Sequence, residues 1–333
     1  MQALVLEGIG QSFTLKDVPV PMLAENEALV KIKAAAFNRR DWWIRQGQYS
    51  GLKFPIVLGS DGAGIVEVTG SDYTKVWTGK EVIINPSIAW GDHEAFQQKT
   101  FHILGLPEDG TFAEYVKVPV ANLYEKPKHL SFEEAAALPL GGLTAYRALF
   151  SRARLREGEK VLVVGIGGGV ATFALQWAKH AGAEVYVTSG KGSKIEQAMA
   201  LGAQGGVLYT DDNWPQQLLE KAGGFDVIVD SALGDGFVHH LDLANPGGRI
   251  VFFGGTAGDI PELNARKIFW KQLSILGTTM GSAADFSEML AFVHEHGIKP
   301  IMDSIHPLED AEAALNKMDT STQFGKIVLR VGQ

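Results

Sequence analysis

VLVVGIGGGVA, at residues 161–171, is an apolar run that breaks into glycines and continues into small apolar residues. Such a stretch predicts a strand, a tight turn and the start of a helix. Glycines in the turn let backbone N–H groups approach an anion closely, and the N-terminal end of the helix carries partial positive charge. The stretch therefore predicts a turn that binds the diphosphate of a dinucleotide. The alternative is a plain connection between a strand and a helix.

The glycine spacing fits one pattern of dinucleotide-binding turns better than another. The pattern G-x-G-x-x-G begins at Gly165, but Val170 stands where its third glycine belongs. Gly165, Gly168 and Ala171 fit a pattern in which the last residue needs only to be small. The P-loop pattern G-x-x-x-x-G-K-[ST] is absent. We expect the following residues of the turn to contact the cofactor: Gly165, Gly167, Gly168, Gly169 and Val170.

The segments around this turn predict a doubly wound parallel sheet. From about residue 127, short apolar runs alternate with helical patterns, which is typical of βαβ units. The expected helices lie near residues 171–178 and 194–201 and from residue 215. The expected strands are 160–164, 184–188, 206–208, 225–230, 249–253 and 274–278. We therefore expect an α/β fold with six parallel strands.

The first 120 or so residues have a different pattern, with short alternating or β-branched runs separated by Gly, Pro and Asn. These runs, at 3–6, 28–34, 64–68, 81–84 and 112–118, predict a small β-rich domain. After residue 280 we expect helices near 285–295 and 308–318 and a closing strand at 326–331 that returns to the first domain.

Composition excludes several classes of function. The 333 residues carry 30 Lys and Arg against 38 Asp and Glu, a net charge of −8, which argues against nucleic acid or an anionic membrane as a partner. The chain has no cysteine, so disulfides, thiolate nucleophiles and cysteine-built zinc sites are excluded. No apolar stretch reaches the ~18 residues that span a bilayer, and Met1 leads straight into a strand-like run. We expect a soluble cytoplasmic protein.

The end of the second expected strand favours NADP(H). An acidic residue at this place would hold the ribose hydroxyls of NAD, but Glu184, which has roughly the right separation from the glycine turn, begins the strand instead of ending it. Ser189, Lys191 and Lys194 stand at its end instead, and hydroxyl and ammonium groups favour the 2′-phosphate of NADP(H). The alternative is that both lysines are solvated loop residues.

Several longer motifs carry a resemblance over nearly the whole chain: NRRDWWIRQG at 38–47, PIVLGSDGAG at 55–64, DGTFAEYV at 109–116, AAALPLGGLTAY at 135–146 and FGKIVL at 324–329. The chain resembles the medium-chain dehydrogenase/reductase superfamily, and more closely its zinc-free quinone oxidoreductase-like branch. The resemblance implies a GroES-like catalytic domain, 1–126 and 283–333, and a Rossmann dinucleotide-binding domain, 127–282. It places the active site in the cleft between them.

The resemblance also indicates whether the chain has ligands for a catalytic metal. Zinc-dependent members hold their catalytic metal with a Cys, a His and a second Cys, and the matching positions here are Asn38, Ser60 and Leu140. Since zinc prefers Cys, His or carboxylate ligands, we expect no metal site.

By the same resemblance, the nicotinamide lies near Asn38 and Asp41. The candidate catalytic residues are Asn38, Asp41, Tyr49 and Ser60, and Trp42 and Trp43 with Tyr49 are candidates for an aromatic wall under a flat substrate. The alternative is that Asn38 caps a helix and that the tryptophans are core residues. Further cofactor contacts carried over from the family are Thr144, Ser231, Leu233, Phe253, Gly254, Gly255 and Lys326.

These residues predict a reaction class. Without a metal, alcohol oxidation loses its Lewis acid, whereas reduction of a quinone or an α,β-unsaturated carbonyl loses less. We therefore expect an NADPH-dependent oxidoreductase that reduces a small electrophile by metal-free hydride transfer. The alternatives are a zinc-type alcohol dehydrogenase-like enzyme acting on alcohols or aldehydes, and a non-catalytic NADPH-binding sensor or structural protein. Members of the family pair their last sheet strands, so we expect a homodimer through residues 274–278.

Overall fold

The computed structural model describes residues 1–332, which form two compact units. Unit 1 comprises Met1–Leu143 and the chain from Gly281 onward, and unit 2 comprises Thr144–Met280. The expected fold class is confirmed, because unit 1 is rich in β-sheet and unit 2 contains a six-stranded parallel sheet. The first boundary lies 17 residues beyond the expected one, since helix α2 (Phe132–Ala137) packs on the strands of unit 1.

The sheet of unit 2 has the strand order β13-β12-β11-β14-β15-β16, and every pair is parallel. The order reverses beside β11, which is the place where dinucleotides bind in such sheets. The strands are β11 (Lys160–Val163), β12 (Glu184–Ser189), β13 (Gly205–Leu208), β14 (Phe225–Asp230), β15 (Ala244–Phe252) and β16 (Ser274–Gly277). All six expected strands are therefore present.

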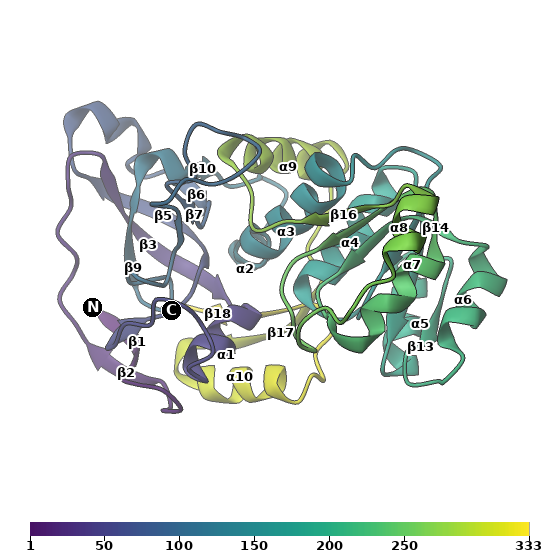
Figure 1. Ribbon diagram of the computed structural model, residues 1–333. Coiled ribbons are helices and arrows are strands. Elements are labelled where there is room, and N and C mark those ends of the chain that lie inside the picture. The colour runs from purple at the N-terminus through teal and green to yellow at the C-terminus, as the bar shows by residue number, and fades with distance from the viewer. Residues whose placement is uncertain (333) are drawn as a thin grey trace. The chain divides into compact units, whose positions relative to one another are not determined.

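The helices of unit 2 alternate with these strands and surround the sheet (Figure 1). Small and aromatic residues of α4 are buried against the sheet, where Trp177 is fully enclosed. The helices are α4 (Gly169–His180), α5 (Gly192–Ala200), α6 (Trp214–Ala222), α7 (His240–Leu243) and α8 (Ala265–Lys271), with helical turns at η3 (Arg147–Arg152) and η4 (Gly234–His239).

Unit 1 is built around a seven-stranded sheet of order β10-β6-β5-β3-β18-β17, with β9 also paired to β3. A three-stranded sheet of order β2-β1-β4 and the hairpin β7-β8 complete it. The strands are β1 (Gln2–Leu6), β2 (Thr14–Asp17), β3 (Glu27–Ala36), β4 (Ile56–Val57), β5 (Asp61–Thr69), β6 (Glu81–Ile84), β7 (Ser87–Ile88), β8 (His102–Ile103), β9 (Tyr115–Pro119), β10 (Leu123–Glu125), β17 (Met302–Pro307) and β18 (Lys326–Arg330).

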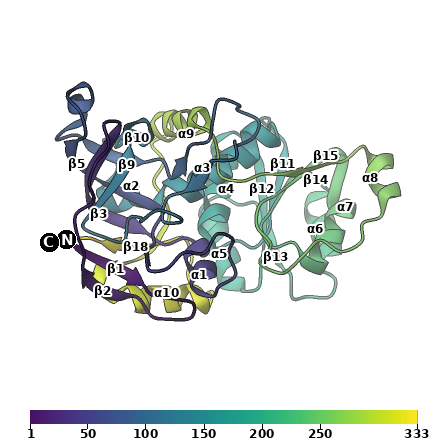
Figure 2. The same ribbon diagram turned by 60° about the vertical axis from the view of Figure 1, so that its left-hand side comes forward.

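The C-terminal segment returns to unit 1 as expected, because β18 pairs antiparallel with β3. Figure 2 shows α1 near α10, and these two helices are in contact. The helices of unit 1 are α1 (Arg39–Arg45), α2, α3 (Pro139–Tyr146, which runs on into unit 2), α9 (Ala283–Glu295) and α10 (Ala311–Asp319), with short turns at η1 (Asp72–Trp77), η2 (Val120–Asn122) and η5 (Leu308–Asp310). Within residues 1–332, no helix is both long and apolar enough to cross a membrane.

Candidate functional site

The glycine-rich turn of unit 2 connects β11 to α4 at the point where the strand order reverses. Gly165 and Gly167 have φ of 71° and 127°, values that side-chain-bearing residues rarely adopt. Thr188, at the end of β12, holds the first half of the turn: its Oγ1 accepts from Gly165 N at 3.1 Å, and its carbonyl accepts from Ile166 N at 2.8 Å. The sequence therefore forms the tight glycine turn that was expected between this strand and helix.

The second half of the turn faces open space. An added Cβ at Gly168 would meet nothing within 4 Å. The first backbone N–H groups of α4, which begins at Gly169, have no acceptor inside the helix, and the first turn of α4 contains no acidic side chain. These groups fit the diphosphate of a dinucleotide, with positive helix-dipole charge directed at it.

Hydroxyl and ammonium groups gather where β12 ends. Ser189 is buried and its Oγ accepts from Lys191 N at 3.1 Å, while the Lys191 side chain is exposed. Lys194 lies directly over the glycine turn, because a Cβ on Gly167 would be 2.8 Å from its Nζ. Ser189, Lys191 and Lys194 thus follow one another from the end of β12 into α5, and their expected contact with a phosphate on the ribose stays a prediction.

The residues expected at the other half of the cofactor follow β14 and β15. Ser231 and Leu233 follow β14, and Thr256 N and Oγ1 donate to the Ser231 carbonyl at 3.3 and 3.1 Å. The turn after β15 contains Phe253, Gly254 and Gly255. Because parallel strands share one carboxyl edge, these turns lie on the same edge as the glycine turn. Thr144 is buried in α3.

Unit 1 contains a buried ionic cluster, which we define as Asn38, Arg40, Asp41, Ser60, Asp61 and Lys326. At its centre, Lys326 Nζ donates to the Phe37 carbonyl at 2.8 Å, to Asn38 Oδ1 at 2.7 Å and to Asp61 Oδ2 at 2.8 Å. Asn38 Nδ2 donates to the same Asp61 oxygen at 2.9 Å, and Leu140 N donates to Asp61 Oδ1 at 2.8 Å. Lys326 therefore uses all three ammonium protons inside unit 1, and its expected contact with phosphate stays a prediction.

Arg40 forms the second half of the ionic cluster. Its Nη1 donates to Ser60 Oγ at 2.6 Å and to the Leu104 carbonyl at 2.9 Å. Its guanidinium lies 5.2 Å from the centre of the Tyr49 ring, and Nε donates to the Tyr49 hydroxyl at 3.5 Å. Among the four candidate catalytic residues, Tyr49 is the one that is only partly buried. Trp42 packs against the core, with its ring 4.6 Å from that of Trp43.

Asp41 is fully buried at the start of α1. Its Oδ2 accepts from Asn38 N at 2.8 Å, while Oδ1 is enclosed and has no hydrogen-bond partner. Burial raises the pKa of Asp41 to about 6, and the charge of Arg40 opposes this shift without cancelling it. Asp41 is therefore a carboxyl group that exchanges a proton near neutral pH.

The raised pKa predicts how Asp41 affects stability. A carboxyl whose pKa is higher in the folded state contributes stability that is complete below its ordinary pKa of 3.8 and is lost as the pH rises through about 6. We expect the free energy of unfolding of the wild type, relative to that of Asp41→Asn, to fall by about 2 kcal/mol between pH 4 and pH 7. Urea titrations of both proteins at several pH values measure this difference.

The matched control for this prediction is Asp235→Asn, which makes the same change at an exposed position. A difference between wild type and Asp41→Asn that stays constant from pH 4 to pH 7, or that grows in favour of the wild type as the pH rises, contradicts the prediction.

Three residues of these sites were not among those expected from the sequence. Arg40 and Asp61 belong to the ionic cluster, and both stand in the quoted motifs as charged residues beside apolar or glycine-rich runs. Tyr209 follows β13, and its hydroxyl lies 2.7 Å from where a Cβ on Gly190 would stand, close to Ser189. For Asp61 the signal was a single charge in an otherwise uncharged motif, whereas Arg40, which stands between Arg39 and Asp41, and Tyr209 had no such signal.

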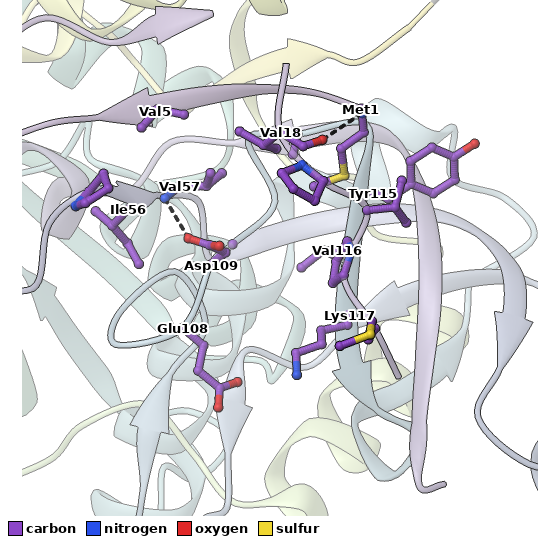
Figure 3. A pocket seen from close by; sticks show the side chains of 17 residues that line it. Met1, Val5, Val18, Ile56, Val57, Glu108, Asp109, Tyr115, Val116 and Lys117 are labelled. Carbon is purple, nitrogen blue, oxygen red and sulfur yellow. Dashed lines mark hydrogen bonds between the residues drawn. The ribbon is translucent and has the colours of Figure 1, made fainter. Parts of the chain in front are cut away.

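A hollow of about 440 Å³ lies elsewhere on unit 1 (Figure 3). Its lining is mostly apolar, from residues such as Val5, Ile56 and Val116, and its Asp109 carboxylate already accepts from Val57 N at 2.9 Å. No residue of the ionic cluster lines this hollow. It is therefore not part of the candidate site.

Each of the two units contains a segment that matches a known protein family. Residues 24–128 match the alcohol dehydrogenase GroES-like domain, and residues 169–295 match the zinc-binding dehydrogenase family. The chain is 34% identical to the zinc-type alcohol dehydrogenase-like protein YogA of Leptosphaeria maculans over 95% of this chain and 94% of that protein. It is 31% identical to the quinone oxidoreductase of Homo sapiens (94% and 92%) and 30% identical to the acryloyl-coenzyme A reductase of Sulfurisphaera tokodaii (99% and 100%).

Two solved structures are similar over nearly the whole chain. An NAD-dependent alcohol dehydrogenase is 39% identical, with a TM-score of 0.91 and full coverage of both chains. The 2-octenoyl-CoA carboxylase reductase CinF, solved with NADP and 2-octenoyl-CoA, is 26% identical, with a TM-score of 0.88 over 99% of this chain and 87% of that chain. Of these two proteins, one is described as NAD-dependent and the other was solved with NADP.

The residues of unit 1 do not fit a zinc ion. Where zinc enzymes carry ligands, Asn38 Oδ1 already accepts from Lys326, Ser60 Oγ accepts from Arg40, and Leu140 has no donor atom in its side chain. Within residues 1–332, no group of three or more His, Cys, Asp or Glu side chains is arranged to hold a metal.

Proposed function

Since this chain belongs to the medium-chain dehydrogenase/reductase superfamily of oxidoreductases, we propose that it reduces a quinone or an α,β-unsaturated carbonyl with NADPH and without a metal. The observation that carries this proposal concerns two positions where zinc-dependent enzymes have metal ligands. Here these positions hold Asn38, which accepts from Lys326, and Ser60, which accepts from Arg40. A reaction that depends on a Lewis acid is disfavoured there. Reduction of an electron-poor carbon needs only a hydride, hydrogen-bond donors for the oxygen and a proton.

Unit 2 supports NADPH as the cofactor. The glycine turn offers N–H groups to the diphosphate, and Ser189, Lys191 and Lys194 stand where a carboxylate would otherwise hold the ribose of NAD. The hydroxyl of Tyr209, a residue that is 50% exposed, adds a neutral donor near Gly190, beside Ser189. When bound, the nicotinamide supplies the hydride.

Unit 1 supplies the groups for the substrate. Tyr49 is the partly exposed candidate, so its hydroxyl is suited to donate a hydrogen bond to the substrate oxygen. Arg40, 5.2 Å from the centre of its ring, fixes the orientation of Tyr49. Asn38, Asp41 and Ser60 act from within the ionic cluster, where they are buried and hold these groups in place.

The proposal is tested by NADPH consumption with phenanthrenequinone and a panel of enones, each measured with and without a chelator. We expect turnover that the chelator does not change. Turnover of alcohols that the chelator abolishes, together with stoichiometric zinc in the purified protein, would support the zinc-type alternative. Tight NADPH binding without turnover of any acceptor would support the sensor alternative.

We further propose that a second copy of the chain pairs with β16. This strand is at the edge of the six-stranded sheet, and the preceding helix α8 exposes Phe269 (62%) and Trp270 (84%). An unpaired strand edge beside large exposed aromatic side chains is suited to a symmetric interface.

Light scattering tests this interface. We expect the wild type to have the mass of a dimer and Trp270→Glu to shift toward the monomer at low micromolar concentration, because a charge would be buried without a partner. Tyr73→Glu is the control, since Tyr73 is 98% exposed but belongs to unit 1. A monomeric wild type refutes the proposal.

A further inference from the structure

Asp230, the last residue of β14, is buried and uses both carboxylate oxygens. Its Oδ1 accepts from Ala232 N at 2.6 Å and from Leu233 N at 3.4 Å. Its Oδ2 lies 2.9 Å from His240 Nε2. Asp230 therefore joins the turn after β14 to the first residue of α7.

His240 is 1% exposed, and within residues 1–332 its ring makes one hydrogen bond, from Nε2 to Asp230. Because an ionised carboxylate only accepts hydrogen bonds, Nε2 carries the proton of this pair. The other ring nitrogen, Nδ1, is enclosed without a partner, and the Phe237 ring packs edge-on at 5.1 Å. Burying a polar ring with one unpaired nitrogen costs free energy of folding. The single hydrogen bond of this ring to Asp230 is therefore expected to matter to the fold or to ligand binding.

The turn that Asp230 holds is strained. Leu233 has φ 58° and ψ −132°, a conformation that residues with branched side chains rarely adopt. The turn is also bonded to the segment after β15, since Ala257 N donates to the Ala232 carbonyl at 2.8 Å. Strained turns persist only where their surroundings fix them, and Asp230 supplies two of the fixing hydrogen bonds.

The strand order gives this turn a place along the cofactor. β12, with Ser189, lies on one side of β11, and β14 and β15 lie on the other. A dinucleotide bound across β11 has its adenosine half at the end of β12 and its nicotinamide half at the ends of β14 and β15. The turn formed by Ser231 and Leu233 therefore meets the nicotinamide half.

We infer that His240 is a positioning residue: through Asp230 it holds the strained turn at Leu233 in the shape that the nicotinamide half of the cofactor binds. The inference rests on the proposed NADPH-binding function. His240 touches neither cofactor nor substrate, and it acts by keeping Asp230 Oδ2 paired, so that Oδ1 stays directed at Ala232 N and Leu233 N.

The test compares two ligands on His240→Phe, which keeps an aromatic ring against Phe237 but removes the donor to Asp230. NADPH spans both halves of the site, whereas 2′,5′-ADP carries the adenosine half and the 2′-phosphate without nicotinamide. We expect His240→Phe to weaken NADPH binding about tenfold or more and to leave 2′,5′-ADP binding within about twofold of the wild type, because only the turn after β14 is altered.

Two further variants make the result specific. His240→Gln keeps an N–H donor for Asp230, so NADPH affinity should return to within about threefold of the wild type. His239→Leu changes the neighbouring histidine, which packs on Trp214 and not on Asp230, and should bind both ligands as the wild type does. If His240→Phe does not fold, His240→Asn, which is too short to reach Asp230, is expected to give the same separation of the two ligands.

Equal weakening of both ligands in a folded His240 variant, or no weakening of NADPH, overturns the inference. Failure of the proposed function gives a different result, because the wild type itself would then bind neither NADPH nor 2′,5′-ADP.

Discussion

Lys326→Met is expected to lower the free energy of unfolding of unit 1 by about 3–5 kcal/mol, because it leaves the buried carboxylate of Asp61 without its charge partner. Both side chains are almost fully buried, at 3% and 0% exposure. The substitution also removes the donor to the Phe37 carbonyl and to Asn38 Oδ1, so two more acceptors lose a hydrogen bond. Urea unfolding measures the change.

Two comparisons distinguish the effect of leaving the Asp61 carboxylate unpaired from the effect of removing a lysine side chain. Lys299→Met removes an ion pair with Glu134 of the same length, 2.8 Å, but at a lysine that is 58% exposed, and should cost no more than about 1 kcal/mol. Asp61→Asn combined with Lys326→Met should be less destabilised than Lys326→Met alone, because no uncompensated charge remains. Equal effects of Lys326→Met and Lys299→Met would contradict a central role for this ammonium group.

The fold of unit 2 was predictable because its signals are local. Each strand is a short apolar run bounded by turn residues, and the glycine turn follows the first of them. Helices α7 and α8 were not expected, and among the strands the largest difference is β15, which begins at Ala244, five residues before the expected start. Pro246 and the two following glycines indicate a loop, and they form a bulge within β15, because the pairing with β14 passes from Phe225 and Ala244 directly to Val227 and Arg249.

The ionic cluster was predictable only in part, because its contacts join distant segments. Asp61 and Lys326 are 265 residues apart and meet because β3 pairs with both β5 and β18. A charged residue in an apolar run indicates burial, but it does not identify its partner. The resemblance therefore drew attention to Asn38 and Ser60 as lost zinc ligands, and the structure adds that Lys326 and Arg40 bind them.

The proposed cofactor site was more predictable from the sequence than the ionic cluster and less predictable than the fold of unit 2. Its glycine turn and the residues Ser189, Lys191 and Lys194 are close in sequence to the strand ends that place them, so their proposed role could be predicted from the pattern. Tyr209 comes near them only because β13 is the neighbour of β12 in the sheet. The Asp230 and His240 pair depends on where α7 packs, which no local pattern indicates.

Removing both lysines at the end of β12 is expected to change the cofactor preference most strongly. Lys191→Ala with Lys194→Ala should weaken NADPH binding by a factor of about 10²–10⁴, because each charge-assisted hydrogen bond to a phosphate contributes about 1.5–3 kcal/mol. NADH lacks the 2′-phosphate and should lose much less, so the ratio of the two dissociation constants, measured by fluorescence titration, falls toward one.

The single variants should differ, because the two lysines occupy different places. The exposed Lys191 is the N-cap of α5, directly after β12, where the 2′-phosphate is expected, so Lys191→Ala should weaken NADPH alone. Lys194 lies over Gly167, within reach of the diphosphate that both cofactors share, so Lys194→Ala should weaken NADPH and, to a smaller extent, NADH. Lys221→Ala, at an exposed position on α6, is the control. A wild type that binds NADH more tightly than NADPH, or a double variant that keeps the wild-type ratio, would refute the assignment of these lysines to the 2′-phosphate.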